Sequence, residues 1–144
     1  MPFIENISLA NVQDGYHYDA GENGVLIQIV DPDMAFPAPR FAFAIVHQFQ
    51  FLDLEEPGPM AIQPEQAIAI VTVLEDALAA GANVIVHCHM GVCRSGAVAE
   101  VGCMMGFEDS GRFRAPNLLV KSSLVDILSA QRSPEACPRK TGFQ

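Results

Sequence analysis

Residues 83–105 read NVIVHCHMGVCRSGAVAEVGCMM, and this stretch decides how the rest of the chain can fold. Its first part, residues 83–87, is mostly apolar and β-branched, which is typical of a buried central strand. A tight segment follows at residues 88–93. Residues 95–105 are then small or apolar until Gly106, a pattern that indicates a buried helix and its end. A strand, a short loop and a helix in this order are typical of an α/β protein.

The segments on either side continue the same alternation. We expect further strands at residues 4–9, 24–30 and 47–52, the first of them at an edge of the sheet, and further helices at residues 64–80 and 118–130. We expect loops at residues 11–23, which could instead form a hairpin, and at residues 31–39, 55–58 and 108–116. Pro64 suits the first position of a helix, and Gly81 suits its end. Together these elements predict an α/β fold with a central, mostly parallel sheet flanked by helices.

Length and composition favour one domain. The chain has 144 residues, half of them hydrophobic, which is enough for a single sizeable core. We therefore expect one domain over residues 1–144. Residues 131–144, which include Pro134 and Pro138, are expected to form a mobile tail of that domain. The sequence leaves the oligomeric state open.

The charge and the cysteines restrict the partners and the compartment. Acidic residues outnumber basic ones by 17 to 8, and the resulting net charge of −9 favours neither nucleic acid nor an anionic membrane as a partner. No stretch approaches the roughly 18 apolar residues of a membrane span, and residues 1–15 lack the basic start and apolar run of a secretory signal. Three of the four cysteines lie between positions 88 and 103, which favours a reducing, cytoplasmic setting over a disulfide framework.

The loop at residues 88–93 is suited to binding an anion. A strand that feeds directly into a helix N-terminus leaves unpaired backbone N–H groups there, and the helix dipole adds to their positive potential. A loop that curls around the anion can direct further N–H groups at it, and Gly91 permits a close approach. Arg94 adds a planar fork that matches two phosphate oxygens. Cys88, at the base of this cradle, would be a stabilised thiolate, so a nucleophile and a phosphate would meet in one site.

These residues resemble the signature of a known family. His87, Cys88, Gly91, Arg94 and Ser95 form the pattern H-C-x-x-G-x-x-R-S, which is similar to that of the cysteine-dependent protein tyrosine phosphatases and looks most like the dual-specificity branch. The resemblance implies a small dual-specificity-phosphatase-like fold. It also implies hydrolysis of phosphomonoesters through a phosphocysteine intermediate, with no cofactor and no metal ion.

The resemblance assigns a role to each matching residue. Cys88 would be the nucleophile, and Arg94 would bind the phosphate and stabilise the transition state. Ser95 would donate a hydrogen bond to the departing thiolate, and His87 would orient the loop without touching substrate. Asn117 would either brace the phosphate loop or cap the last helix. The phosphate itself would lie against Arg94 and the loop residues His89, Met90, Gly91, Val92 and Cys93.

The leaving oxygen needs a proton, so we expect a carboxylic acid beside the cradle. Asp53 stands just past a predicted strand, with one helix and one strand between it and Cys88. The dual-specificity phosphatases carry their acid at a similar place, so the resemblance implies that Asp53 is the general acid. Glu55 and Glu56 are the nearest substitutes.

The composition of the loop indicates the class of substrate. None of the residues between Cys88 and Arg94 is Lys or Arg. Phosphatases of highly charged inositol lipids usually carry basic groups there, so a phosphorylated protein is the more natural partner. No segment resembles the loop that gives the large tyrosine phosphatases a deep pocket. We expect phosphotyrosine as the substrate because its aryl leaving group is the better one, with phosphoserine and phosphothreonine as further candidates.

Other interpretations of the same residues remain open. A rhodanese-like sulfurtransferase also places a cysteine in a strand-to-helix loop, but it would not need Asp53. An inactive phosphatase fold could bind phosphoproteins, although the residues that such proteins usually lose are all present here.

Zinc binding by the Cys and His residues is disfavoured, because adjacent residues rarely converge on one tetrahedral ion. Cys93 could protect Cys88 as a reversible disulfide, as a similarly spaced pair does in the low-molecular-weight tyrosine phosphatases.

Overall fold

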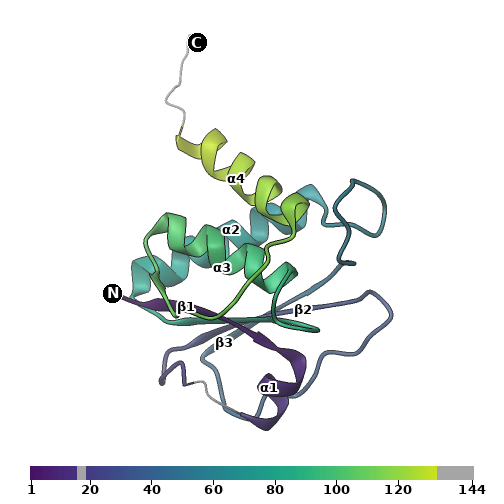
Figure 1. Ribbon diagram of the computed structural model, residues 1–144. Helices are drawn as coiled ribbons and strands as arrows, with labels where there is room; N and C mark the ends of the chain where they lie inside the picture. Colours follow the sequence, from purple (N-terminus) through teal and green to yellow (C-terminus); the bar gives the residue numbers. More distant parts are fainter. Residues whose placement is uncertain (16–18, 133–144) are drawn as a thin grey trace.

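The computed structural model describes residues 1–15 and 19–132 (Figure 1). Five strands form one sheet in the order β3-β2-β4-β1-β5, and every strand pairing is parallel. The strands are β1 (Phe3–Ser8), β2 (Val25–Val30), β3 (Ile45–Gln50), β4 (Val84–Cys88) and β5 (Glu108–Asp109). The helices are α1 (Leu9–Asp14), α2 (Pro64–Ala80), α3 (Arg94–Met105) and α4 (Leu118–Arg132). The predicted α/β fold class is confirmed.

The most apolar strands, β2 and β4, lie in the middle of the sheet. Every residue of both strands is buried, as is usual for parallel strands that are covered on both faces. Their register aligns Gln28 with His87 near the carboxyl end of the sheet. On the other side of β4, Ser8 aligns with Cys88. The end of β1 therefore lies beside the loop that follows β4.

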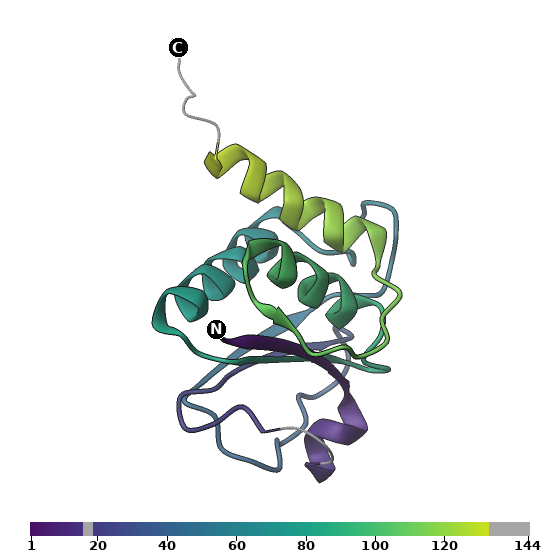
Figure 2. The same ribbon diagram turned by 60° about the vertical axis from the view of Figure 1, so that its left-hand side comes forward.

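The helices cover the two faces of the sheet unequally. The helices α2, α3 and α4 lie together over one face, and α1 lies on the opposite side (Figure 1, Figure 2). The larger hydrophobic cluster includes Leu74 of α2, Val98 of α3 and Leu124 of α4. A smaller cluster joins Val12 of α1 to the sheet residue Ile85. The sheet thus has a hydrophobic core on each face. These two cores hold the central strands, and therefore the loops at their ends, in place.

The two long helices that follow β3 and β4 have the predicted ends. The helix α2 begins with Pro64 and stops at Gly81, whose φ of 68° is the left-handed conformation of a helix end. The helix α3 begins at Arg94, one residue before the predicted start, and ends at Met105. Most of its residues are buried, so it is a core helix that presents its N-terminus to the carboxyl end of the sheet.

Two predictions near the N-terminus are wrong. Most of α1 falls within residues 11–23, where we expected a loop or a hairpin. The helix forms because Oγ of Ser8 accepts a hydrogen bond of 3.1 Å from the N–H of Asn11, and Gly15 ends it. Strand β1 is also not at the edge of the sheet, because the short strand β5 pairs with its outer side.

Smaller differences concern element boundaries. Strand β3 spans residues 45–50 rather than 47–52, so the chain leaves the sheet at Phe51. The helix α4 continues to Arg132, two residues into the expected tail, and residues 133–144 lie outside the described residues. No helix in the described part of the chain is both long enough and apolar enough to cross a membrane.

Candidate active site

The loop between β4 and α3 lies at the carboxyl end of the sheet, where ligands bind in parallel α/β folds. Gly91, in the middle of the loop, has a φ of 77°, and a Cβ atom added to it would lie 2.3 Å from the carbonyl carbon of Ile7. Only glycine fits here, because any side chain would collide with the backbone of β1. The loop is therefore packed directly against the end of β1.

The backbone carbonyls of the loop are bonded to groups outside it. His89 O accepts from Leu9 N–H at 3.1 Å, Gly91 O from Asn6 Nδ2 at 2.7 Å, Val92 O from Ala115 N–H at 3.1 Å and Cys93 O from Asn117 N–H at 2.9 Å. In a trans peptide the carbonyl and the N–H that follows it point in opposite directions. The N–H groups of residues 90, 92, 93 and 94 are thus turned toward the inside of the loop. A ring of N–H groups at a helix N-terminus is an anion-binding cradle.

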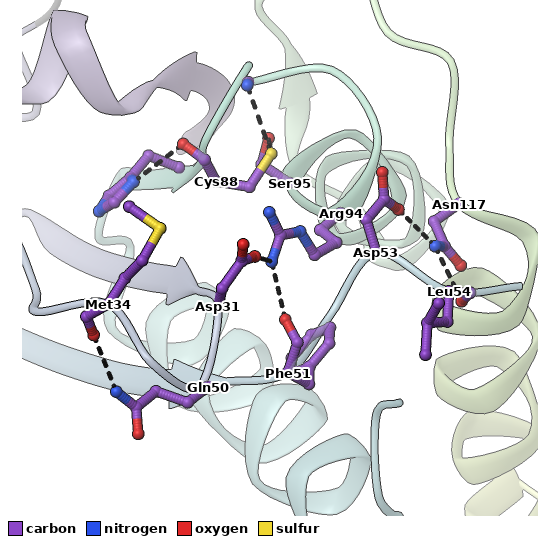
Figure 3. A network of polar contacts seen from close by, with 12 residues as sticks. Asp31, Met34, Gln50, Phe51, Asp53, Leu54, Cys88, Arg94, Ser95 and Asn117 are labelled. Carbon is purple, nitrogen blue, oxygen red and sulfur yellow. Dashed lines mark hydrogen bonds and ion pairs between the residues drawn. The ribbon is translucent and has the colours of Figure 1, made fainter. Parts of the chain in front are cut away.

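The thiol of Cys88 lies at the base of this cradle (Figure 3). Its Sγ is 3.1 Å from Oγ of Ser95 and accepts a hydrogen bond of 3.3 Å from the N–H of Gly91. Cys88 is only 2% exposed, and Ser95 is fully buried. An N–H directed at the sulfur, a hydroxyl within hydrogen-bond distance and the N-terminus of α3 are surroundings that suit a thiolate nucleophile.

His87 supports the loop from below. The side chain is completely buried, and its Nδ1 lies 3.2 Å from the carbonyl oxygen of Cys88. Burial is the main reason that the pKa of His87 is lowered from 6.5 to about 4, and the positive charge of Arg94 acts in the same direction. The imidazole is therefore neutral at pH 7, and a proton on Nδ1 can be donated to the carbonyl of Cys88.

Arg94 has partners that the sequence did not indicate. Its side chain is 6% exposed, and Nη1 donates to Oδ1 of Asp31 at 2.8 Å and to the carbonyl oxygen of Phe51 at 2.7 Å (Figure 3). Asp31 directly follows β2, as Phe51 directly follows β3. Both acceptors therefore reach Arg94 from the carboxyl ends of neighbouring strands. An acidic residue immediately after a buried strand was the only signal for Asp31 in the sequence.

Asp53 is held by Asn117. Its Oδ1 accepts a hydrogen bond of 2.6 Å from Nδ2 of Asn117, which also donates to the carbonyl of Leu54 at 3.0 Å (Figure 3). At the same time Oδ1 of Asn117 accepts from the N–H of Val120 at 2.9 Å, so the residue caps α4. Its own N–H bonds the carbonyl of Cys93. The side chain of Asn117 thus joins the loop of Asp53 to α4, and its backbone N–H ties both to the loop at residues 88–93.

A cavity of about 360 Å³ brings the central predicted residues together. Its lining consists of Asp31, Leu52, Asp53, Leu54, Cys88, His89, Met90, Cys93 and Arg94. Ser95, His87 and Asn117 do not line the cavity but contact residues that do. Its volume falls within the usual range for a small-molecule site, and its lining combines a thiol, a cation and two carboxylates with apolar walls.

The two substitutes for Asp53 lie outside the cavity, and one supporting residue was not predicted. Glu55, a substitute for Asp53, instead accepts a hydrogen bond of 3.1 Å from the N–H of Leu118 at the start of α4. Neither Glu55 nor Glu56 lines the cavity. Asn6, which the sequence analysis missed, is buried in β1 and holds the carbonyl of Gly91. Within residues 1–15 and 19–132, no three His, Cys, Asp or Glu side chains are grouped so as to hold a metal ion.

Comparison with solved structures identifies the fold. The chain is similar to the human tyrosine phosphatase-like serine/threonine/tyrosine-interacting protein, with a TM-score of 0.64 and 15% identity over 91% of this chain and 94% of that one. For human DUSP28 the TM-score is 0.59 with 20% identity over 91% and 96% of the two chains. For a mouse putative dual specificity phosphatase complexed with zinc tungstate it is 0.55 with 18% identity over 84% and 78%. No protein-family model and no curated protein matches the chain.

The fold is thus that of the compact dual-specificity and tyrosine phosphatases, as the signature residues led us to expect. The three similar structures share only 15% to 20% of their residues with this chain. Because one fold can host many functions, the activity has to be argued from the side chains of the loop and the cavity.

Proposed function

We propose that this protein is a cysteine-dependent phosphatase that hydrolyses phosphomonoesters through a phosphocysteine intermediate, with protein phosphotyrosine as its main substrate. One observation carries the proposal. Sγ of Cys88 lies at the base of a loop whose carbonyls are bonded outward, in the same cavity as Arg94 and Asp53. A thiolate, an anion cradle and a carboxylic acid are the parts that displacement at phosphorus requires.

In the first step, the thiolate of Cys88 attacks phosphorus and an S–P bond forms. The P–O bond to the leaving group breaks, and protonated Asp53 gives its proton to the departing oxygen. The inward N–H groups and Arg94 stabilise the charge that develops on the phosphoryl oxygens. This step leaves a phosphocysteine and a free alcohol or phenol.

In the second step, a water molecule attacks the phosphorus atom of the intermediate. The carboxylate of Asp53 takes one proton from this water, and the S–P bond breaks. Oγ of Ser95, 3.1 Å from the sulfur, donates a hydrogen bond to the thiolate that leaves. Inorganic phosphate is released, and Cys88 and Asp53 return to their starting protonation states.

The charges of the cavity favour a substrate with a single phosphate group. Arg94 is the only Lys or Arg residue in the lining, and it is already paired with Asp31, while Asp53 adds a second carboxylate. A multiply phosphorylated lipid or an RNA end would be repelled there. The similar mouse protein is described as complexed with zinc tungstate, and tungstate is a tetrahedral oxyanion like phosphate, which supports an oxyanion site in this fold. A reducing compartment such as the cytoplasm would keep the Cys88 sulfur reduced.

A second candidate is a phosphoprotein-binding domain without turnover. One similar human protein is described as phosphatase-like and interacting. In the present chain Arg94 is bonded to Asp31 and Asp53 to Asn117, which would also suit a site that binds phosphate without reacting. A rhodanese-like sulfurtransferase is the third candidate, and it would have no use for Asp53.

The decisive experiment follows hydrolysis of p-nitrophenyl phosphate near pH 6, with reductant and a chelator, for the wild type, Cys88→Ser and Asp53→Asn. We expect turnover that is lost in Cys88→Ser and reduced about 10²-fold in Asp53→Asn. Cys103→Ser, a cysteine of α3 outside the cavity lining, is the matched control and should keep wild-type turnover. An inactive wild type that still binds a phosphotyrosine peptide would favour the binding domain. Turnover that is lost in Cys88→Ser but kept in Asp53→Asn would show that Asp53 is not the general acid.

A further inference from the structure

The guanidinium of Arg94 is satisfied at one end and open at the other. Nη1 donates to both Asp31 and Phe51, as described above. Nε, in contrast, is buried and has no hydrogen-bond partner. A buried donor without a partner is destabilising, and such a group in a native protein calls for an explanation. A ligand oxygen in the cavity would supply the missing partner.

The planar geometry of the guanidinium determines which of its edges is free to bind a ligand. Its N–H groups lie in one plane, and Nε shares one edge of the fork with Nη2. The two acceptors at Nη1 are on the other terminal nitrogen, so they leave the Nε–Nη2 edge free to bind two oxygens of a phosphate. Figure 3 shows Asp31 and the carbonyl of Phe51 at the same terminal nitrogen of Arg94.

The position of Asp31 in the fold allows its contact with Nη1 of Arg94 to form without substrate. Asp31 follows the last residue of β2, a completely buried strand next to β4. Its side chain is 34% exposed and also lines the cavity beside Cys88. A flexible arginine would have to be ordered each time substrate binds, whereas an arginine already fixed at Nη1 loses little further freedom.

We propose that Asp31 is a positioning residue. It holds Arg94 so that the Nε–Nη2 edge of the guanidinium already faces the cavity, where the phosphate will lie, before substrate binds. The inference rests on the proposed phosphatase function. Asp31 contributes the acceptor for Nη1, and it also contributes a negative charge near the phosphate. The charge weakens binding of the free anion, while the acceptor aligns Arg94 for the transition state. These two effects have opposite signs, so the test must separate them.

Two substitutions at position 31 make that separation. Asp31→Asn and Asp31→Ala both remove the charge, but only Asn retains an oxygen that can accept from Nη1. We expect kcat for p-nitrophenyl phosphate to be about tenfold lower in Asp31→Ala than in Asp31→Asn. Asp33→Ala, an exposed aspartate two residues away that does not line the cavity, controls for the loss of an acidic residue in this loop. Equal kcat in the Asn and Ala variants would overturn the proposal.

A double-mutant cycle tests whether Asp31 acts through Arg94. In an Arg94→Lys background the guanidinium fork is absent, so exchanging Asn for Ala at position 31 should change kcat by less than about threefold. An undiminished tenfold difference in that background would show that Asp31 acts elsewhere, and thermal melts of each variant separate such effects from unfolding.

A binding measurement keeps this inference distinct from the proposed function. Calorimetry with inorganic tungstate needs no turnover, and we expect at least about fivefold weaker binding in Asp31→Ala than in Asp31→Asn. If the wild type proved inactive but this difference held, the phosphatase proposal would fail while the positioning role of Asp31 stood. If the wild type were active and the two variants bound tungstate equally, only the positioning role would fail.

Discussion

Asn117 donates a hydrogen bond of 2.6 Å from its side-chain amide to Oδ1 of Asp53, across 64 positions of the chain. The same buried amide caps α4 through its oxygen, and its backbone N–H bonds the carbonyl of Cys93. Asn117, which does not line the cavity, therefore fixes the proposed acid relative to the loop at residues 88–93.

Substitution of Asn117 by Ser should separate its capping role from its contact with Asp53. Ser is a good N-cap, so α4 keeps its first hydrogen bond, while the donors to Asp53 and Leu54 are lost. We expect kcat to fall about tenfold with phenyl phosphate but only about threefold with p-nitrophenyl phosphate, because the poorer leaving group depends more on the acid. In an Asp53→Asn background the substitution should add little. An equal loss with both substrates would mean that Asn117 has no specific effect on proton transfer.

Gly91→Ala should disrupt the loop itself. The added Cβ would lie 2.3 Å from the carbonyl carbon of Ile7, at a φ of 77° that disfavours any side chain. We expect the free energy of unfolding to fall by more than about 2 kcal/mol, with activity largely lost. Gly58→Ala is the matched control, since no heavy atom lies within 4 Å of its added Cβ, and it should change stability by less than about 0.5 kcal/mol. Chemical denaturation of both variants makes the comparison, and similar stabilities would contradict it.

The sequence predicts best those elements that carry their own local signals. The helix α2 is bounded by Pro64 and Gly81, and the central strand β4 is a continuous apolar run. By contrast, α1 has six residues, too few for helical periodicity to be visible, and only Ser8 marked its start. Strand β5 is two residues long and polar, and it exists because the chain passes beside β1. Tertiary contact, rather than local pattern, determines such elements.

The same distinction applies to the site. The signature residues could be recognised because they lie within one short stretch around Cys88. Asp31 and Asn6 were missed because they reach the loop only through the order of the strands in the sheet. Asp31 is separated from Arg94 by 63 positions, and Asn6 from Gly91 by 85. A single sequence holds no record of which strand lies beside which, so a polar residue in or just after an apolar strand was the only available hint.

The buried imidazole of His87 should make the protein less stable in mild acid. Its pKa falls from 6.5 to about 4 on folding, so between these values the unfolded chain binds a proton that the folded protein does not. The stability contributed by the neutral ring is full above pH 6.5 and declines as the pH falls toward 4. Between pH 7 and pH 5 the loss should be about 2 kcal/mol.

His87→Asn tests this pH dependence, because an amide N–H can replace Nδ1 as donor to the carbonyl of Cys88 while nothing titrates. Urea denaturation at pH 5, 6 and 7 should show that the wild type loses about 2 kcal/mol more than the variant over this interval. The difference between the two proteins removes the contribution of the carboxylates. Parallel pH profiles would mean that folding does not change the pKa of His87.

Cys93 should protect Cys88 against irreversible oxidation. Both cysteines line the cavity, and burial, followed by the nearby carboxylate of Asp53, raises the pKa of the Cys93 thiol. Cys88 would therefore react first with peroxide to give a sulfenic acid and hydroxide. Attack of the Cys93 sulfur on this sulfenic acid then forms the disulfide and releases water, which prevents further oxidation to the sulfinic acid.

Mild peroxide treatment of the wild type should thus give a Cys88–Cys93 crosslink by peptide mass spectrometry, with activity restored by dithiothreitol. Cys93→Ser should instead accumulate the sulfinic acid at Cys88 and lose activity permanently. Cys103→Ser is the control, because Cys103 lies outside the cavity lining beside Arg114, and it should behave as the wild type does. Full recovery of oxidised Cys93→Ser by dithiothreitol, or a crosslink to another cysteine, would show that Cys93 is not the resolving residue.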